Sequence, residues 1–284
     1  MVEKNSGTLY VVATPIGNLG DMTPRAVEIL QQVDKIAAED TRHSGPLLRH
    51  FLISKPVISL HDFNERERLD QVIGALRQGE SIALISDAGT PLISDPGFHL
   101  VRTAKAEGIT VSPIPGACAL IAALSAAGLP TDKFVFEGFL PAKNEARKQY
   151  LQTLLRETRT MIFYEAPHRL LAALQTLHEV FGAARKAVVA REISKVYESL
   201  ISDELQNLVH YYAEHKDECR GEVVLLLAGF EQTDDASVLV YPQEVLNHLL
   251  QELPLKQAVS LASKITGGRR NDLYEAALVL KPGK

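Results

Sequence analysis

The sequence predicts an α/β protein with two α/β domains, a parallel five-stranded sheet followed by a mixed sheet, and a small C-terminal helical domain. Three observations carry this prediction. Short apolar runs alternate with helical patterns through the first half of the chain, which is typical of a parallel sheet with right-handed crossovers. Later, two apolar runs are separated by only four residues, which requires a hairpin. Three short helical patterns end the chain.

The first domain is expected to span residues 1–116. Thr23 and Pro24 form a helix N-cap and first helical position. Polar loops follow four of the five predicted strands, so one edge of the sheet collects them. The predicted strands are 9–13, 35–39, 57–60, 82–85 and 109–113.

The second domain is expected at 117–230, the linker at 231–240 and the helical domain at 241–284. The second domain begins with a helix of small residues at 117–127. Its later elements are strands at 134–139, 161–165, 188–192, 197–202 and 222–228, with helices at 142–156 and 168–181. The C-terminal helical patterns are 244–251, 255–266 and 271–280, and Gly267 and Gly268 separate the last two.

Composition places the chain among globular proteins. Hydrophobic residues make up 46% and charged residues 23%, which fits neither a disordered nor a fibrous class. The two cysteines offer no disulfide framework, which indicates a reducing compartment. The apolar runs are well short of the roughly 18 residues of a membrane span. We expect a cytoplasmic protein without a membrane span.

Charge is unevenly distributed. The formal net charge is −5, yet residues 255–284 carry six basic against two acidic side chains. A basic end on an acidic chain indicates a local contact with an anionic partner, and three short helices with a glycine turn resemble a helix-turn-helix. A solvated helical cap would have the same pattern, so both interpretations stay open.

The stretch Ser86–Gly97 is the most informative loop. It follows an apolar strand and contains two glycines, two prolines and two aspartates. Ligands bind at the carboxyl ends of strands in open α/β sheets, so the sequence predicts a stiff ligand-binding loop. The alternative is a pair of ordinary turns, since Asp, Gly, Pro and Ser are common turn residues.

Several kinds of site are excluded by motif. The sequence has no P-loop, no dinucleotide fingerprint after a strand and no nucleophile elbow. His210, His215 and Cys219 are interpreted as part of a surface helix, so no metal is expected. Stiff strand-end loops with carboxylates, and without a cluster of phosphate-binding cations, suit a zwitterionic or cationic ligand.

A family resemblance runs from about residue 9 to 280. The chain resembles the ribosomal RNA small subunit methyltransferase I family of the tetrapyrrole methylase-like superfamily, whose fold has two α/β domains. The motifs that carry the resemblance are Thr14–Leu19, Glu39–His43, Ser86–Gly97, Pro115 with Gly116, Phe136–Pro141, Phe163–Glu165 with His168 and Arg169, and Ala190–Glu192 with Lys195.

The resemblance implies S-adenosylmethionine-dependent methylation of the ribose 2′-hydroxyl of a decoding-centre cytidine in 16S rRNA. It implies a homodimer that acts on this RNA, in the small ribosomal subunit or free. The cofactor would lie between the two α/β domains. The implied cofactor-binding residues are Pro15, Ile16, Gly17, Asp87, Gly89, Thr90, Pro91, Ile93, Cys118, Ala119, Tyr164, Glu165, Arg191, Glu192, Gly221 and Glu222.

Catalysis needs alignment and a base for the ribose hydroxyl. The candidates for the general base are Asp40, His43, Asp87 and Glu165, with structural pairing such as Asp40–Arg42 or Glu165–Arg169 as the alternative. Thr90 stands where the superfamily often has Asp, so Asp87 or Asp95 takes over that carboxylate. We expect Asp87→Ala to abolish cofactor binding. The candidate RNA-binding residues are Arg42, Lys143, Arg147, Lys148, Arg169, Lys195, Lys256, Arg269 and Arg270.

Two other function classes remain open at the level of sequence. A methylase of the same superfamily could act on a small tetrapyrrole or on a protein residue, because a fold does not set the substrate. A noncatalytic RNA-binding protein could use the helix-turn-helix-like end, but this leaves the strand-end loops unexplained.

Overall fold

The computed structural model describes residues 6–61, 65–230 and 242–280. The chain divides into two compact units, Met1–Phe230 and Glu231–Lys284. The first unit contains two five-stranded sheets, and the second contains three helices among its described residues.

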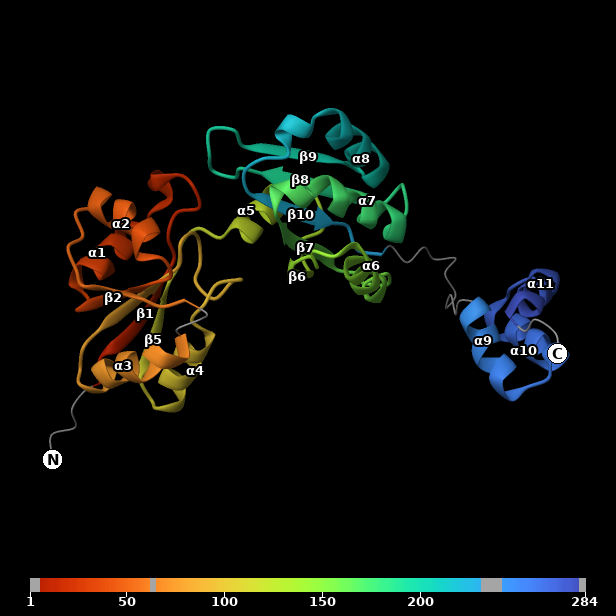
Figure 1. Cartoon of the computed structure of the whole chain (residues 1–284), viewed down its shortest axis with the longest axis horizontal. Coiled ribbons are helices and arrows are strands. Elements are labelled where there is room, and N and C mark those ends of the chain that lie inside the picture. Colours follow the sequence, from red (N-terminus) through yellow and green to blue (C-terminus); the bar gives the residue numbers. More distant parts are fainter. Residues whose placement is uncertain (1–5, 62–64, 231–241, 281–284) are drawn as a thin grey trace. The chain divides into compact units, whose positions relative to one another are not determined.

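The first sheet is parallel, with the strand order β3-β2-β4-β1-β5. Helices α1 and α2 cover one face and α3 and α4 the other (Figure 1). The strands are β1 (Thr8–Val12), β2 (Lys35–Ala38), β3 (Val57–Ser59), β4 (Ile82–Ile85) and β5 (Thr110–Ile114). The helices are the 3-10 turn Leu19–Asp21, α1 (Pro24–Gln32), α2 (Thr41–His50), α3 (Glu65–Arg77) and α4 (Phe98–Ala106).

Side-chain caps set where these helices begin. The Thr23 hydroxyl accepts a hydrogen bond from the Ala26 N–H at the start of α1, with Pro24 in the first helical position. Glu65, which is buried, accepts a hydrogen bond of 3.0 Å from the Leu100 N–H at the start of α4. These caps satisfy N–H groups that a helix leaves without partners.

Helix α2 was not predicted. Gly45 and Pro46 lie inside it, and proline removes a helical hydrogen bond. The helix forms because Asp40 caps it through the Arg42 N–H at 2.8 Å and because Leu48 packs into the core beside β2. Tertiary packing here overrides a weak local pattern.

The second sheet is mixed, with the strand order β6-β7-β10-β8-β9. Only β6 and β7 pair in parallel among these strands, and β8 and β9 form the predicted antiparallel hairpin. Helix α5 (Ala119–Ala126) covers one face, and three helices cover the other. The strands are β6 (Phe134–Phe139), β7 (Thr160–Glu165), β8 (Lys186–Arg191), β9 (Ser199–Glu204) and β10 (Val223–Leu227). The remaining helices are α6 (Asn144–Thr153), α7 (Leu170–Phe181) and α8 (Leu205–Glu214), with 3-10 turns at Pro167–Arg169 and Lys216–Glu218.

The second unit is a small helical bundle of α9 (Pro242–Glu252), α10 (Leu255–Thr266) and α11 (Arg270–Leu280). Its core contains Leu246, Ala258 and Leu273, one residue from each helix. Gly267 ends α10 in the left-handed region, with φ of 70°, which is a common helix C-terminus for glycine. The predicted fold class is confirmed. No helix in the described part of the chain is long and apolar enough to cross a membrane.

Candidate active site

A cavity of about 330 Å³ lies where loops of the first sheet meet the second sheet within the first unit. This volume is at the lower end of the roughly 300–1,000 Å³ typical of small-molecule sites. The loop after β4 forms one wall with residues such as Thr90 and Asp95, and the N-terminus of α5 contributes Cys118. The ends of β6 and β7 and the start of β10 form the opposite wall, which includes Tyr164 and Val224.

The loop after β4 is held by backbone pairing with the loop after β1. The Thr14 N–H donates to the Gly89 carbonyl at 2.8 Å, and the Gly89 N–H donates to the Thr14 carbonyl at 3.1 Å. The Thr90 hydroxyl donates to the Ala117 carbonyl at 3.0 Å. The loop after β4 is therefore bonded to the segment after β1 and to the segment between β5 and α5.

Gly89 cannot be replaced freely in this loop. Its φ is +78°, and a Cβ there would lie 3.2 Å from Ile16 Cγ2. Leu92 and Ser94 also have positive φ values, 73° and 68°. Non-glycine residues in this region carry strain of order 1–3 kcal/mol, which is frequent at binding sites.

Tyr164 and two phenylalanines form an aromatic part of the cavity wall. The Tyr164 ring lies edge-on to Phe136 at 4.8 Å and to Phe139 at 5.7 Å between ring centroids. Burial raises the pKa of the Tyr164 hydroxyl, which lies near Cys118 and the Leu120 N–H. The hydroxyl stays protonated, and the ring presents an apolar surface to the cavity.

Glu165 ends β7 and lines the same cavity. It is 3% exposed. Oε1 accepts hydrogen bonds from the Ala166 N–H at 2.7 Å and from Arg169, whose Nη2 lies at 2.5 Å. Oε2 is buried and has no hydrogen-bond partner among the described residues. Most buried polar atoms have a hydrogen-bond partner, so Oε2 is an exception in this part of the structure.

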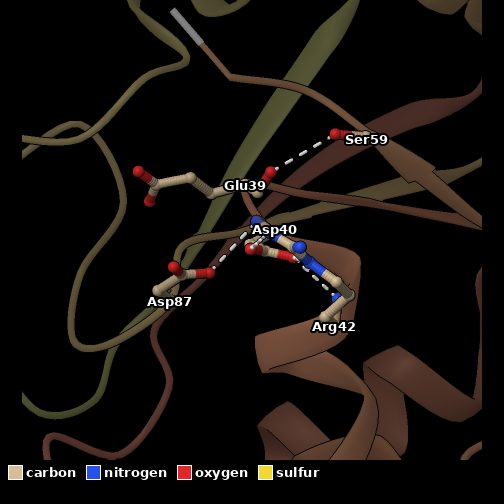
Figure 2. Close-up of polar contacts among 5 residues, drawn as sticks. All are labelled: Glu39, Asp40, Arg42, Ser59 and Asp87. Carbon is tan, nitrogen blue, oxygen red and sulfur yellow. Dashed lines mark hydrogen bonds and ion pairs between the residues drawn. The ribbon is translucent and has the colours of Figure 1, made fainter.

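A second polar cluster lies at the ends of β2 and β4 (Figure 2). Asp87 Oδ1 accepts a hydrogen bond of 3.1 Å from the Asp40 N–H. Asp40 forms a double contact with the Arg42 guanidinium, at 3.1 Å to Nε and 2.8 Å to Nη2. The hydrogen bonds from Arg42 hold the pKa of Asp40 well below its usual range. The Glu39 carbonyl accepts a hydrogen bond from Ser59 at 3.4 Å.

Many predicted cofactor residues line the cavity. They come from the loops after β1 and β4, the start of α5, the end of β7 and the start of β10. They are Ile16, Gly89, Thr90, Ile93, Cys118, Ala119, Tyr164, Glu165, Gly221 and Glu222.

Other predicted cofactor residues do not line it. Asp87 lies in the second polar cluster, and Glu192 accepts hydrogen bonds at 2.8 Å from the Glu222 N–H and from Lys195. Arg191 lies on the sheet face that α6, α7 and α8 cover, where its charge acts on Tyr211 and Tyr212. Those outside the lining are Pro15, Gly17, Asp87, Pro91, Arg191 and Glu192.

The candidates for catalysis are likewise divided. Asp40 and Asp87 are together in the second polar cluster, and Glu165 lies in the cavity wall. The pairings Asp40–Arg42 and Glu165–Arg169 both form. His43 is exposed on α2 and does not line the cavity.

The prediction that Arg147 binds RNA is corrected by its burial. Arg147 is 3% exposed and donates to Thr176, Asn144 and the Ala172 carbonyl. Burial lowers its pKa. The pattern of basic residues on α6 suggested an RNA surface, but the guanidinium holds α6 against α7 instead.

The other candidate cations differ in what surrounds them. Lys148 pairs with Glu179, and Lys195 pairs with Glu192 and Glu222. Arg42 is largely exposed although it pairs with Asp40. The exposed cations Lys143, Lys256, Arg269 and Arg270 have no ion pair among the described residues.

Some cavity residues escaped the sequence analysis. Phe139 is part of the motif Phe136–Pro141, but the motif alone does not place its side chain in the cavity. A register shift in the pairing of β6 and β7 lies next to Phe139. Phe139 could have been predicted only from its position beside Tyr164 in the neighbouring strand, and that position is known only once the two strands are paired. The residues that were not predicted are Ala88, Ser94, Phe139, Ala166, Pro167, Ile193, Val223 and Val224, whereas Asp95, a named candidate for the carboxylate, does line the cavity.

No group of three or more His, Cys, Asp or Glu residues in the described ranges could hold a metal ion. His215 stacks on Tyr211 with ring centroids 4.2 Å apart, and His210 lies 3.5 Å from Glu214. These contacts are within or next to α8.

Family comparisons agree with this geometry. Residues 8–209 match the family of tetrapyrrole (corrin/porphyrin) methylases. Residues 242–281 match the RsmI C-terminal HTH domain. The first match covers both sheets' strands apart from β10, and the second covers the helical unit.

Solved structures with this fold include methyltransferases of several kinds. Uroporphyrin-III-C-methyltransferase from Thermus thermophilus aligns with a TM-score of 0.56 at 17% identity, over 78% of this chain and 94% of that chain. Diphthine synthase aligns with a TM-score of 0.59 at 16% identity, over 78% and 90%. At this identity the likeness concerns the fold alone.

Curated relatives are much closer in sequence. Ribosomal RNA small subunit methyltransferase I of Pseudomonas aeruginosa is 56% identical over 96% of this chain and 98% of its own length. The protein of that name from Escherichia coli O157:H7 is 48% identical over 97% and 96%.

The two sheets, the loop after β4 and the cavity between strand ends define a methyltransferase of the tetrapyrrole methylase class. Within that class, the chain belongs to the ribosomal RNA small subunit methyltransferase I family.

Proposed function

We propose that this chain transfers the methyl group of S-adenosylmethionine to the ribose 2′-hydroxyl of a decoding-centre cytidine in 16S rRNA. Membership of the family supports methylation of small-subunit rRNA. A solved structure with this fold is a uroporphyrin-III C-methyltransferase complexed with S-adenosylhomocysteine, at a TM-score of 0.54 and 18% identity. The position on the ribose and the choice of cytidine rest on the resemblance described above.

The charge of the cavity is the observation that carries the cofactor proposal. Asp95, Glu165 and Glu222 line it, and no lysine or arginine does so in the described part of the chain, although Arg169 pairs with Glu165 and Lys195 with Glu222 from outside the lining. S-adenosylmethionine has a sulfonium and an ammonium group, so carboxylates favour its binding.

The residues that would hold the cofactor come from both walls. The loop from Gly89 to Asp95 would supply backbone groups to the amino-acid part, and the wall with Phe139 and Tyr164 would contact the nucleoside. When bound, the cofactor supplies an electrophilic methyl group. The transfer would break the C–S bond, with its electron pair passing to sulfur, as the bond to the ribose oxygen forms.

The protein chiefly aligns the reacting groups and excludes water. In-line attack needs the reacting atoms about 3–3.5 Å apart. The ribose hydroxyl also loses its proton, and a positioned base contributes about 10²–10⁴-fold.

We assign Asp87 as this general base. Asp40 is a weak base because Arg42 lowers its pKa, and the Glu165 side chain is paired with Arg169 and is 0% exposed. Asp87 directly precedes Ala88 and Gly89, which line the cavity. Its Oδ1 accepts the Asp40 N–H, which fixes the direction of the carboxylate.

The C-terminal unit is proposed to contact the RNA. Lys256, Arg269 and Arg270 are exposed there, and phosphate contacts by such cations provide affinity and position. We retain the division into residues 1–116, 117–230, 231–240 and 241–284, of which 231–240 lie outside the described residues. We also propose a homodimer, which the resemblance supports, and a cytoplasmic location, which the use of only two cysteines supports.

Mass mapping of 16S rRNA tests the proposed function. In cells that lack the protein, we expect one cytidine to lose its 2′-O-methyl group, and the wild-type chain should restore it. A complete methylation pattern in these cells would contradict the proposal. A methyl group gained by a small tetrapyrrole or a protein in the purified reaction would favour the alternative substrates.

A further inference from the structure

Helix α11 carries an exposed stripe that the core of its own unit does not use. Arg270, Tyr274 and Leu278 follow one another at intervals of four residues, so their side chains are neighbours on one side of the helix. Tyr274 is 39% exposed, Leu278 is 51% exposed, and Arg270 is exposed as well. The core of the helical unit takes Leu273 and Ala277 from α11 instead. Packing of the unit therefore does not account for the tyrosine.

The ring of Tyr274 is available to a ligand. Tyr274 has no hydrogen bond and no ring contact among the residues that the structure describes. The carboxylates of α11, Asp272 and Glu275, are two residues and one residue away from it. Helical side chains at these spacings do not face each other. The exposed stripe of α11 thus combines one cation, one aromatic ring and one aliphatic side chain without a carboxylate.

The segment that leads into the stripe is basic. Residues 264–270 contain Lys264, Arg269 and Arg270 and no carboxylate. All three cations are exposed, and none has an ion pair in the described part of the chain. A surface of this charge favours an anionic partner over an apolar protein surface.

The turn between α10 and α11 is fixed by hydrogen bonds of its own side chains. The Ser263 hydroxyl donates to the Gly268 carbonyl at 2.8 Å, and the Gly268 N–H donates to the Thr266 hydroxyl at 3.2 Å. Gly267, between them, adopts a φ of 70°. These contacts set the direction in which the chain enters α11, so the start of the exposed stripe is held in place before any partner binds.

The geometry of RNA decides what this helix can contact. In DNA-binding proteins, the second helix of a helix-turn-helix enters the major groove. A-form RNA has a deep, narrow major groove that side chains do not read, and proteins recognise unpaired RNA bases by stacking them on aromatic rings. An exposed tyrosine next to an unpaired cation therefore suits a single strand better than a duplex.

We infer that Tyr274 stacks on an unpaired base of the substrate RNA, and that Arg270, one helical turn before it, binds a phosphate of the same strand. The inference rests on the proposed RNA substrate and deepens the proposed contact of the C-terminal unit. Every base has a π-face, so stacking tolerates any sequence. The contact provides affinity for unpaired RNA and does not select the cytidine that is modified.

Binding of RNA to the full-length chain tests the inference without turnover. The probes are a single-stranded oligoribonucleotide of mixed sequence and the same strand fully paired with its complement. Tyr274→Leu removes the ring but keeps a good helix former. We expect about 5- to 150-fold weaker binding of the single strand, the usual effect of losing one stacked base. Binding of the duplex should stay close to that of the wild type.

Two control variants isolate the ring. Tyr274→Phe keeps it and should bind the single strand like the wild type. Leu261→Ala changes an apolar side chain on α10 that is 40% exposed, as Tyr274 is at 39%, and it should also bind normally. An equal loss in Leu261→Ala and Tyr274→Leu would contradict stacking. Circular dichroism during heating verifies that each variant is folded.

The salt dependence separates stacking from the phosphate contact. Tyr274→Leu changes no charge, so the slope of the logarithm of affinity against the logarithm of salt concentration should equal that of the wild type. A smaller slope in Tyr274→Leu would attribute its loss of affinity to the phosphate contacts and would contradict the inference.

Fluorescence reports the contact directly, because the chain contains no tryptophan. Tyr274→Trp places a single indole in the exposed stripe, and Leu261→Trp places one on α10 as the matched control. Stacking on a base quenches indole emission. We expect saturating single strand to lower the emission of Tyr274→Trp and to leave that of Leu261→Trp nearly constant. Equal responses of the two variants, or no response of Tyr274→Trp, would overturn the inference.

The outcomes distinguish this inference from the proposed function. If the wild-type chain binds neither RNA probe, the proposed RNA contact of the C-terminal unit fails. If the wild type binds the single strand and Tyr274→Leu binds it equally well, this inference alone fails. An altered sedimentation coefficient of Tyr274→Leu with unchanged RNA affinity would assign the exposed stripe to a second copy of the chain and would also overturn the inference.

Discussion

Asp87 Oδ1 accepts a hydrogen bond of 3.1 Å from the backbone N–H of Asp40, which joins the end of β4 to the end of β2 (Figure 2). These two strands are neighbours in the parallel sheet. Asp40 in turn caps α2 and pairs with Arg42. The carboxylate of Asp87 is thereby oriented by backbone geometry next to the cavity loop.

Asp87→Asn should lower kcat about 10²–10⁴-fold, the usual contribution of a general base. The affinity for S-adenosylhomocysteine should stay close to that of the wild type, because Asp87 does not line the cavity and Asn can still accept the Asp40 N–H. Single-turnover methyl transfer and calorimetry measure the two effects. Loss of cofactor affinity in this variant would instead favour the direct cofactor contact that the sequence suggested.

Arg147→Met should lower the free energy of unfolding by about 2–3 kcal/mol, because it leaves buried acceptors without their charged donor. Urea unfolding measures this loss. Lys143→Met, at an exposed position on the same segment, should change stability by less than about 0.5 kcal/mol. A stable Arg147→Met variant with reduced rRNA affinity would show that Arg147 does contact RNA.

Gly89→Ala should weaken binding of S-adenosylhomocysteine and destabilise the fold. The left-handed conformation costs an alanine about 1–2 kcal/mol, and its Cβ would press on Ile16 at 3.2 Å. Gly108→Ala is the matched control, since Gly108 has φ of +72° but no atom within 4 Å of the added Cβ. Gly108→Ala should lose a similar amount of stability but bind S-adenosylhomocysteine like the wild type. Equal ligand affinities in the two variants would contradict a role of the Gly89 loop in binding.

Some parts of the site could be predicted from the sequence and others could not, as individual residues show. The strand-end loops were predictable because apolar runs stop abruptly at Pro, Gly and Asp, and Gly89 and Thr90 reach the cavity as expected. The burial of Arg147 was not predictable, because it depends on a contact with Thr176, which lies 29 residues away on another helix.

The missed parts of the site share this origin. Phe139 reaches the cavity next to a register shift between β6 and β7, and Arg191 takes the opposite face of the second sheet from α5. A strand's pairing and face are set by its neighbours, which a single sequence does not show. Helix α2 formed despite Gly45 and Pro46 because Asp40 caps it.

Glu157→Gln should reduce stability at pH 7 by about 1 kcal/mol, since the pair with Arg159 is partly exposed. Hydrogen bonds from Arg159 lower the pKa of Glu157 to about 2. The unfolded chain therefore takes up this proton first as the pH falls, and the stabilisation is lost between about pH 4.3 and pH 2. Urea unfolding from pH 7 downward should show the wild type and the variant converging; a constant difference would contradict the effect.

Arg269→Gln with Arg270→Gln, in the full chain, should weaken binding to small-subunit rRNA and reduce the salt slope of binding by about 2. Both side chains are exposed at the start of α11. Neither side chain lines the cavity, so the affinity for S-adenosylhomocysteine should be unchanged. An unchanged salt slope would show that these cations do not contact phosphates.

The central claim is tested most directly by incubating the purified chain with methyl-labelled S-adenosylmethionine and either free 16S rRNA or small ribosomal subunits from cells that lack the protein. Nuclease digestion and mass spectrometry then locate the label. We predict a single labelled product, a 2′-O-methylcytidine in the decoding centre. Label on a base, or no label in either RNA substrate, would contradict the account.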